Sequence, residues 1–208
     1  MGDAAATMKR SNYKNTVYDL KRLIGREWDD VSVQADIARM MNKDAYQRLD
    51  NGKIGIKVQY DEGSLIMTPE DLTAMLLTQL KKTAETNYGG RKVGDVVVSV
   101  PGFLTDVQRR AMIDAGKIAG LNVLGLINEN TASALSYGIY KSAKNVFDVK
   151  ERHIVMFIDV GYASFSVSVV AFIQGRLQQV VARIEQGSSS RADGALPAPR
   201  LRPPLCAR

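Results

Sequence analysis

The spacing of apolar residues before position 90 predicts short helices, then two strands and one long helix. Apolar side chains recur at helical intervals in residues 15–25 and again in residues 31–41. Apolar and polar residues then alternate in IGIKVQY, and a polar DEGS segment separates this run from LIM. Two strands joined by a turn are therefore expected between Ile54 and Met67.

The clearest helix start in the chain is Thr68-Pro69-Glu70-Asp71. It combines a hydroxyl N-cap, a proline at the first helical position and acids near the positive end of the helix dipole. Gly89-Gly90 ends this helix. Its expected buried face consists of Leu72, Met75, Leu76, Leu80 and Ala84.

In the second half of the chain, strands alternate with helices. Residues 95–101 and 153–161 hold the nearly continuous apolar runs VVVSV and IVMFIDV, which are typical of strands covered on both faces. Thr105 and Gln108 form a capping-box signature, so a helix is expected to begin there. A short strand is expected over residues 122–127.

A second helix is expected from about Asn130 to Tyr140, where small residues allow close packing on a sheet. Residues 163–173 and 176–184, joined at Gln174-Gly175, are typical of an antiparallel hairpin. This order of elements predicts an α/β layered domain preceded by a smaller α+β insertion. Residues 187–208 hold four of the six prolines without periodicity, which predicts a disordered tail.

Composition narrows the class of protein. The chain has 208 residues, of which 45% are hydrophobic and 24% charged, as in soluble globular proteins. The single cysteine, Cys206, excludes an internal disulfide, and the single histidine, His153, leaves no Cys/His cluster for zinc. No apolar run approaches the length of a membrane span and no signal peptide is evident, so we expect a cytoplasmic location.

The positive charge is unevenly distributed. Half of the net charge of +6 lies in the last 22 residues, where four arginines stand against one aspartate. Elsewhere basic and acidic residues are interleaved, which favours a solvated surface over a nucleic-acid-binding patch. Nucleic acid and membranes are therefore not expected as partners.

Three polar residues are candidates for chemistry on local sequence alone. Asp159 ends a buried strand before Gly161, where a carboxylate can hold hydrated Mg²⁺, although a plain structural turn is the favoured interpretation of the local pattern. Glu129 follows the strand LGLIN at an edge where α/β proteins bind ligands, but its surroundings are also an ordinary helix start. Lys21 can contact a phosphoryl group, although most such lysines are merely solvated.

Successive sequence blocks together resemble the ATPase domains of the heat shock protein 70 superfamily. The blocks cover roughly residues 1–184 in matching order and spacing. They are GDAA, NTV with KRLIGR, VVVSVPGF with Asp106 and Arg109-Arg110, IAGLNVLGLINENTASALSYG and FIDVG. The resemblance implies an actin-like ATPase fold, in which two lobes with ribonuclease-H-like sheets enclose a nucleotide cleft.

The resemblance also implies roles for individual residues, with ATP or ADP and Mg²⁺ as cofactors. Lys21 is similar to the family's phosphate-contacting lysine, and Glu129 to its glutamate that orients water and metal. Asp159 is similar to the aspartate that positions Mg²⁺ or the attacking water. The second phosphate loop corresponds to Gly161, Tyr162, Ala163 and Ser164.

Departures from the ordinary chaperone pattern are similar to the heat shock protein 110 branch. The chain has Asn-Glu-Asn-Thr where those chaperones have Asn-Glu-Pro-Thr, and Tyr162 and Ala163 stand where they have loop glycines. Side chains there restrict backbone approach to phosphates, so hydrolysis is expected to be weak or absent. Members of this branch are nucleotide exchange factors and holdases, which implies heat shock protein 70 chaperones as partners, and unfolded polypeptides for the full-length relative.

The resemblance also implies an incomplete domain. We expect a small α+β subdomain of the first lobe (1–94), the α/β part of that lobe (95–150), the start of the second lobe (151–186) and an unrelated tail (187–208). The family's N-terminal strands, first phosphate loop and adenosine-binding segments are not recognised in this sequence. An alternative function is that of a non-catalytic remnant that acts only as an interaction module, or has no function.

Overall fold

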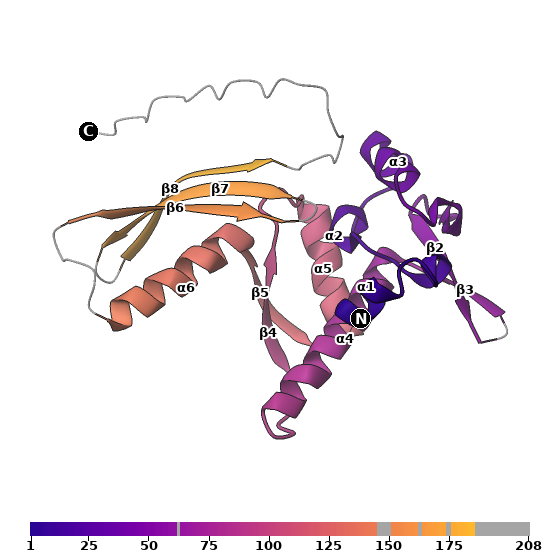
Figure 1. The fold of residues 1–208 in the computed structure, drawn as a ribbon, viewed down its shortest axis with the longest axis horizontal. Helices are drawn as coiled ribbons and strands as arrows, with labels where there is room; N and C mark the ends of the chain where they lie inside the picture. Colours follow the sequence, from indigo (N-terminus) through magenta and orange to yellow (C-terminus); the bar gives the residue numbers. More distant parts are fainter. Residues whose placement is uncertain (62, 145–150, 162–163, 174–175, 186–208) are drawn as a thin grey trace.

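The computed structural model describes residues 1–61, 63–144, 151–161, 164–173 and 176–185. Figure 1 labels helices and strands along the chain, and their mixed α/β content agrees with the sequence prediction. The expected tail (187–208) lies outside the described residues, as do Tyr162 and Ala163 of the expected phosphate loop.

The N-terminal part consists of short helices beside a three-stranded antiparallel sheet of order β1-β2-β3. Its elements are α1 (Asp3–Thr7), η1 (Tyr13–Asn15), α2 (Leu20–Leu23), α3 (Val31–Ala38), η2 (Lys43–Ala45), β1 (Tyr46–Arg48), β2 (Ile54–Tyr60) and β3 (Gly63–Met67). The predicted hairpin of β2 and β3 is confirmed. The pattern did not predict α1 or β1.

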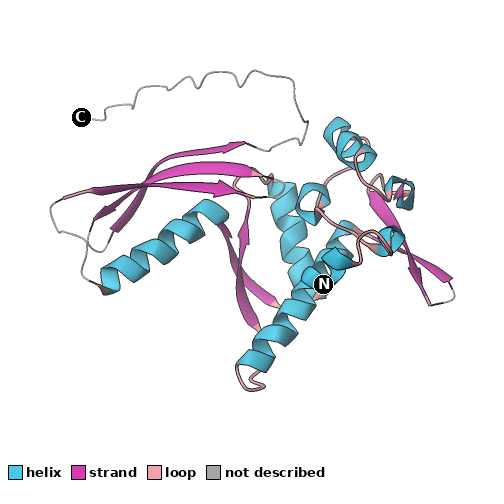
Figure 2. Ribbon diagram, in the orientation of Figure 1, coloured by secondary structure: helices cyan, strands magenta, loops and turns pink. Residues whose placement is uncertain are grey.

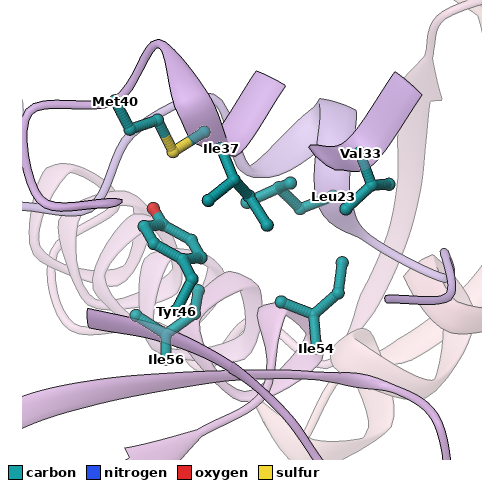
Figure 3. Packing of buried hydrophobic residues seen from close by; sticks show 7 residues of the cluster. All are labelled: Leu23, Val33, Ile37, Met40, Tyr46, Ile54 and Ile56. Carbon is teal, nitrogen blue, oxygen red and sulfur yellow. The ribbon is translucent and has the colours of Figure 1, made fainter. Parts of the chain in front are cut away.

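A hydrophobic cluster holds α2 and α3 on this sheet. Figure 3 shows the seven side chains, which come from α2, α3, the segment that follows α3 and the sheet, and point toward one another. They are Leu23, Val33, Ile37, Met40, Tyr46, Ile54 and Ile56. Leu23 therefore anchors the short helix that also carries Lys21, since burial of such a side chain contributes roughly 1.5–3 kcal/mol.

Helix α4 (Pro69–Asn87) begins as the sequence predicts, because the Thr68 hydroxyl accepts a hydrogen bond from the Asp71 amide. The predicted buried face is wrong for three of its five residues, whereas Leu72 is partly buried against the core of the N-terminal sheet. Met75, Leu76 and Leu80 are exposed, and the helix instead buries Pro69, Thr73 and Ala74.

Strands β4 (Asp95–Val100) and β5 (Asn122–Asn128) form a two-stranded parallel sheet, and the crossover between them contains helix α5 (Asp106–Ile118). The Thr105/Gln108 capping box that starts α5 is confirmed. The prediction that β4 is covered on both faces is wrong, because burial alternates along the strand and Val97 is exposed. The apolar run of β4 therefore meets helices on one face only within the described residues.

The C-terminal part is a three-stranded antiparallel sheet of order β6-β7-β8 with helix α6 lying along it, as Figure 2 shows. The elements are α6 (Glu129–Ala143), β6 (His153–Val160), β7 (Phe165–Ile173) and β8 (Arg176–Glu185). The predicted hairpin of β7 and β8 is confirmed. Ala134 of α6 is fully buried against Val170 and Phe172, as its small-residue pattern predicts.

Candidate functional site

Lys21 is carried by the single turn of α2, which is held on both flanks. Leu23 belongs to the core of the N-terminal sheet, and Ile24 to the cluster of α4, α5 and β4. Arg22 donates two hydrogen bonds to the buried Asp36 carboxylate on α3, at 3.0 and 2.9 Å. The backbone of Lys21 is therefore fixed while its side chain remains 64% exposed.

The two sequence candidates Lys21 and Glu129 are in direct contact. Lys21 Nζ donates to Glu129 Oε1 at 2.6 Å, across 108 residues of sequence. Glu129 is the first residue of α6, immediately after the carboxyl end of β5, and its side chain is one quarter exposed. The contact brings a cation and a carboxylate together at the end of a parallel sheet, where α/β proteins bind ligands.

An arginine that the sequence analysis did not assign to the site orients the segment before Glu129. Arg109 donates to the Asn128 side-chain oxygen at 2.9 Å and to the Leu104 carbonyl at 3.1 Å. Asn128, the N-cap residue of α6, makes no side-chain capping bond. The only advance signal was the position of Arg109 within a family block.

Asp159 is joined to the same site through one strand pair. It lies opposite Ser166 in the β6–β7 register, and Ser166 Oγ donates to Asn130 Oδ1 at 2.8 Å. Because directly opposed residues of antiparallel strands share a face, the Asp159 side chain lies on the face of the sheet that carries α6. Within the described residues, no hydrogen bond or ion pair joins Asp159 to Lys21 or Glu129.

Gly161 and Ser164 are the two residues of the expected phosphate loop that the structure describes. The Gly161 amide donates to the Ser164 carbonyl at 2.9 Å, which closes a tight turn after β6. This confirms the turn expected from the Asp-x-Gly pattern, while phosphate binding by it stays a prediction.

Burial shifts the pKa of one acid beside α2. Desolvation raises the pKa of Asp19, and the nearby Asp36 adds to this rise, while Arg22 and Lys9 oppose it. Asp19 also has a left-handed backbone, with φ of 57°. The helix that carries Lys21 is therefore preceded by a partly desolvated carboxylate in an uncommon conformation.

The donor set suits a hydrated magnesium nucleotide. Mg²⁺ keeps several waters and needs only one or two carboxylates beside phosphate oxygens, and Glu129 and Asp159 supply that number. No group of three or more His, Cys, Asp or Glu side chains gathers as a metal site in the described ranges. Lys21 and the Ser164 hydroxyl are groups that can contact phosphate.

No helix in the described part of the chain is long and apolar enough to cross a membrane.

Comparison with known proteins gives consistent matches. The family model described as Hsp70 protein matches residues 1–186. The chain is 46% identical to the 97 kDa heat shock protein of Mesocentrotus franciscanus over 85% of its own length and 20% of that protein. It is 47% identical to heat shock 70 kDa protein 4 of Canis lupus familiaris, over 86% of this chain and 21% of that one.

A third relative, heat shock protein 110 of Caenorhabditis elegans, is 44% identical over 86% of this chain and 23% of its own length. The chain thus spans about a fifth of the length of the curated relatives that it matches.

Proposed function

Since this chain belongs to the Hsp70 protein family, for which an actin-like ATPase fold is implied, we propose that it forms part of the nucleotide-binding domain of a chaperone or co-chaperone. The similarity to heat shock protein 110 places the proposal in that branch, and the proposed role is nucleotide exchange and holding of unfolded polypeptides. The proposed partners are heat shock protein 70 chaperones, and the proposed compartment is the cytoplasm.

The 2.6 Å contact between Lys21 and Glu129 carries this proposal. A bound nucleotide would supply the phosphoryl group, and its Mg²⁺ would supply positive charge that stabilises the transfer. Lys21 is exposed enough to turn from Glu129 to a phosphate oxygen. Glu129, released from that contact, is then free to accept a hydrogen bond from a water molecule or from the hydration shell of the metal.

Asp159 is proposed to hold water or Mg²⁺ from the facing strand, and the Gly161–Ser164 turn to contact phosphate. Weak hydrolysis remains the proposal, because Tyr162 and Ala163 occupy positions where ordinary chaperones have glycine. The division of residues 1–94, 95–150 and 151–186 between two lobes is proposed on the same basis.

The test is a thermal melt of the 208-residue chain with and without excess Mg-ATP or Mg-ADP. A ligand that binds only the native state raises the melting temperature, so the wild-type chain should melt higher with nucleotide. The Lys21→Met and Glu129→Gln variants should melt like the wild type without nucleotide and lose that rise. A wild-type transition that nucleotide does not move would defeat the proposal.

The second candidate function is a nucleotide-independent interaction module. It is favoured by the apolar side chains Ile154, Met156, Ile158 and Val160, which are more than half exposed along β6. Capture of a purified heat shock protein 70 chaperone in the absence of nucleotide, by a chain that fails the melting test, would support it.

A further inference from the structure

The start of α6 is tied to β7 by one buried polar contact. Ser166 Oγ donates to Asn130 Oδ1 at 2.8 Å, and both residues are more than nine-tenths buried. The next contacts along the same interface are apolar, between Ala134, Val170 and Phe172. The Asn130–Ser166 hydrogen bond is therefore a polar exception at the end of the interface nearest Glu129.

Stability alone does not explain this exception. The Asn130 side-chain Nδ2 and the hydroxyl of Ser168, the next residue on that face of β7, are both buried and have no hydrogen-bond partner in the described structure. A buried donor without an acceptor costs free energy, whereas an apolar side chain of similar size would pack there without that cost. The geometry that the contact imposes is the better explanation.

The contact joins the two elements that carry the candidate carboxylates. Asn130 directly follows Glu129, and Ser166 is the register partner of Asp159. Strand pairing fixes Ser166 relative to Asp159, and the helix backbone fixes Asn130 relative to Glu129. One side-chain hydrogen bond thus links both halves of the candidate site.

We propose that the Asn130–Ser166 hydrogen bond is a positioning contact that sets the separation of the Glu129 and Asp159 carboxylates. The consequence for ligand binding rests on the proposed function, namely that these carboxylates serve a magnesium nucleotide. Asn130 and Ser166 act through their neighbours and do not themselves touch the nucleotide.

The first test needs no nucleotide. Amides of residues 133–136 of α6 donate to the carbonyls of the first turn, so their hydrogen exchange reports how firmly that turn is held. Ser166→Ala should speed their exchange roughly fivefold, as expected for loss of one hydrogen bond, and leave residues 139–143 unchanged. Ser166→Thr, which keeps the hydroxyl, should restore slow exchange.

Ser168→Ala is the matched control, because Ser168 lies on the same strand face, is also buried and has no partner for its hydroxyl among the described residues. It should leave exchange at residues 133–136 unchanged. Equal acceleration by Ser168→Ala and Ser166→Ala, or none by Ser166→Ala, would overturn the proposed contact whether or not the chain binds nucleotide.

The second test measures Mg-ADP affinity by titration calorimetry. Asn130→Ala and Ser166→Ala should each weaken binding roughly five- to tenfold, and the double variant should be no weaker than either, because both remove the same bond. Alanine favours helix formation over asparagine, so a loss in Asn130→Ala cannot reflect a weaker helix.

The outcomes separate the two proposals. If the wild-type chain binds no Mg-ADP, the proposed function is defeated. The hydrogen-exchange experiment then still tests whether the Asn130–Ser166 hydrogen bond holds the first turn of α6. A wild-type chain that binds Mg-ADP while both variants bind equally well overturns the positioning role.

Discussion

Gly25 lies so close to Gln108 that a β-carbon placed on the glycine would be 2.6 Å from the Gln108 Cα atom. Gly25 follows α2, and Gln108 lies in the first turn of α5, so this contact packs the turn that carries Lys21 against the crossover helix. Gly25 also has a φ of 66°, a backbone conformation that favours glycine.

Gly25→Ala should therefore destabilise the chain by two separate effects. The positive φ costs roughly 1–2 kcal/mol for a residue with a β-carbon, and the clash with backbone requires α2 and α5 to separate, so a total of about 2–4 kcal/mol is expected. Denaturant unfolding followed by circular dichroism measures it.

Gly90→Ala is the control, because Gly90 has a φ of 82° but a β-carbon at this position would have no neighbouring atom within 4 Å among the described residues. Gly90→Ala should lose only the free energy that the positive φ costs a residue with a β-carbon, roughly 1–2 kcal/mol. Equal losses in the two variants would show that the approach of Gly25 to Gln108 contributes nothing.

The two ion pairs of α2 should differ sharply in their effect on stability. Arg22 and Asp36 are nearly buried and share two hydrogen bonds, so Arg22→Met leaves the buried carboxylate with only the longer 3.8 Å ion pair to the exposed Arg39 and should cost roughly 3 kcal/mol. Lys21→Met removes an exposed pair, for which less than about 1 kcal/mol is expected. Urea unfolding of both variants decides between them, and a larger loss in Lys21→Met would mean that the Glu129 contact is structural.

Local sequence predicts where a helix starts better than it predicts which face of the helix is buried. The capping boxes at Thr68 and Thr105 form because the interacting groups lie three residues apart. The predicted buried face of α4 was wrong at Met75, Leu76 and Leu80 because periodicity gives an apolar stripe without saying what covers it. Thr73 and Ala74 are buried instead, where α4 packs near α5, and Met75 remains exposed.

The contacts of the candidate site, like the buried face of α4, are not predicted by local sequence. No local pattern predicts that Lys21 and Glu129 meet, and only the family resemblance placed them together. The surroundings of Glu129 also had the interpretation of an ordinary helix start, yet the Asn128 side chain accepts a hydrogen bond from Arg109 and the Asn130 side chain accepts one from Ser166. These side chains serve contacts between elements, which depend on the fold.

Asp19→Asn should stabilise the chain at neutral pH. Burial raises the pKa of Asp19 in the folded state, so the unfolded chain loses this proton first as pH rises. Stability is therefore full below the unfolded pKa of roughly 3.9 and decreases until the pH passes the folded value. Asparagine avoids this loss and tolerates the positive φ of residue 19.

The gain from Asp19→Asn should disappear below about pH 4, where aspartic acid is protonated in both states. Melting temperatures of the two proteins at acidic and neutral pH measure this difference. A gain of the same size at both pH values would show that the carboxylate's ionisation is not its cause.

The outer face of β6 should govern the solubility of the chain. Ile154, Met156 and Ile158 are each more than half exposed and alternate with residues that face α6, so they form an apolar row on the opposite side of the sheet. Contiguous apolar surface of this kind promotes association. Replacing all three with threonine preserves β propensity while lowering the apolar area, so light scattering on heating should fall and the melting temperature should change little.

Val170→Thr is the contrasting variant, because Val170 is 1% exposed beneath α6. It buries a hydroxyl in an apolar contact and should cost roughly 1–3 kcal/mol, since that polar group has no partner there. If the triple threonine variant scattered light as strongly as the wild type while Val170→Thr scattered more, association would arise from partial unfolding and not from the exposed face of β6.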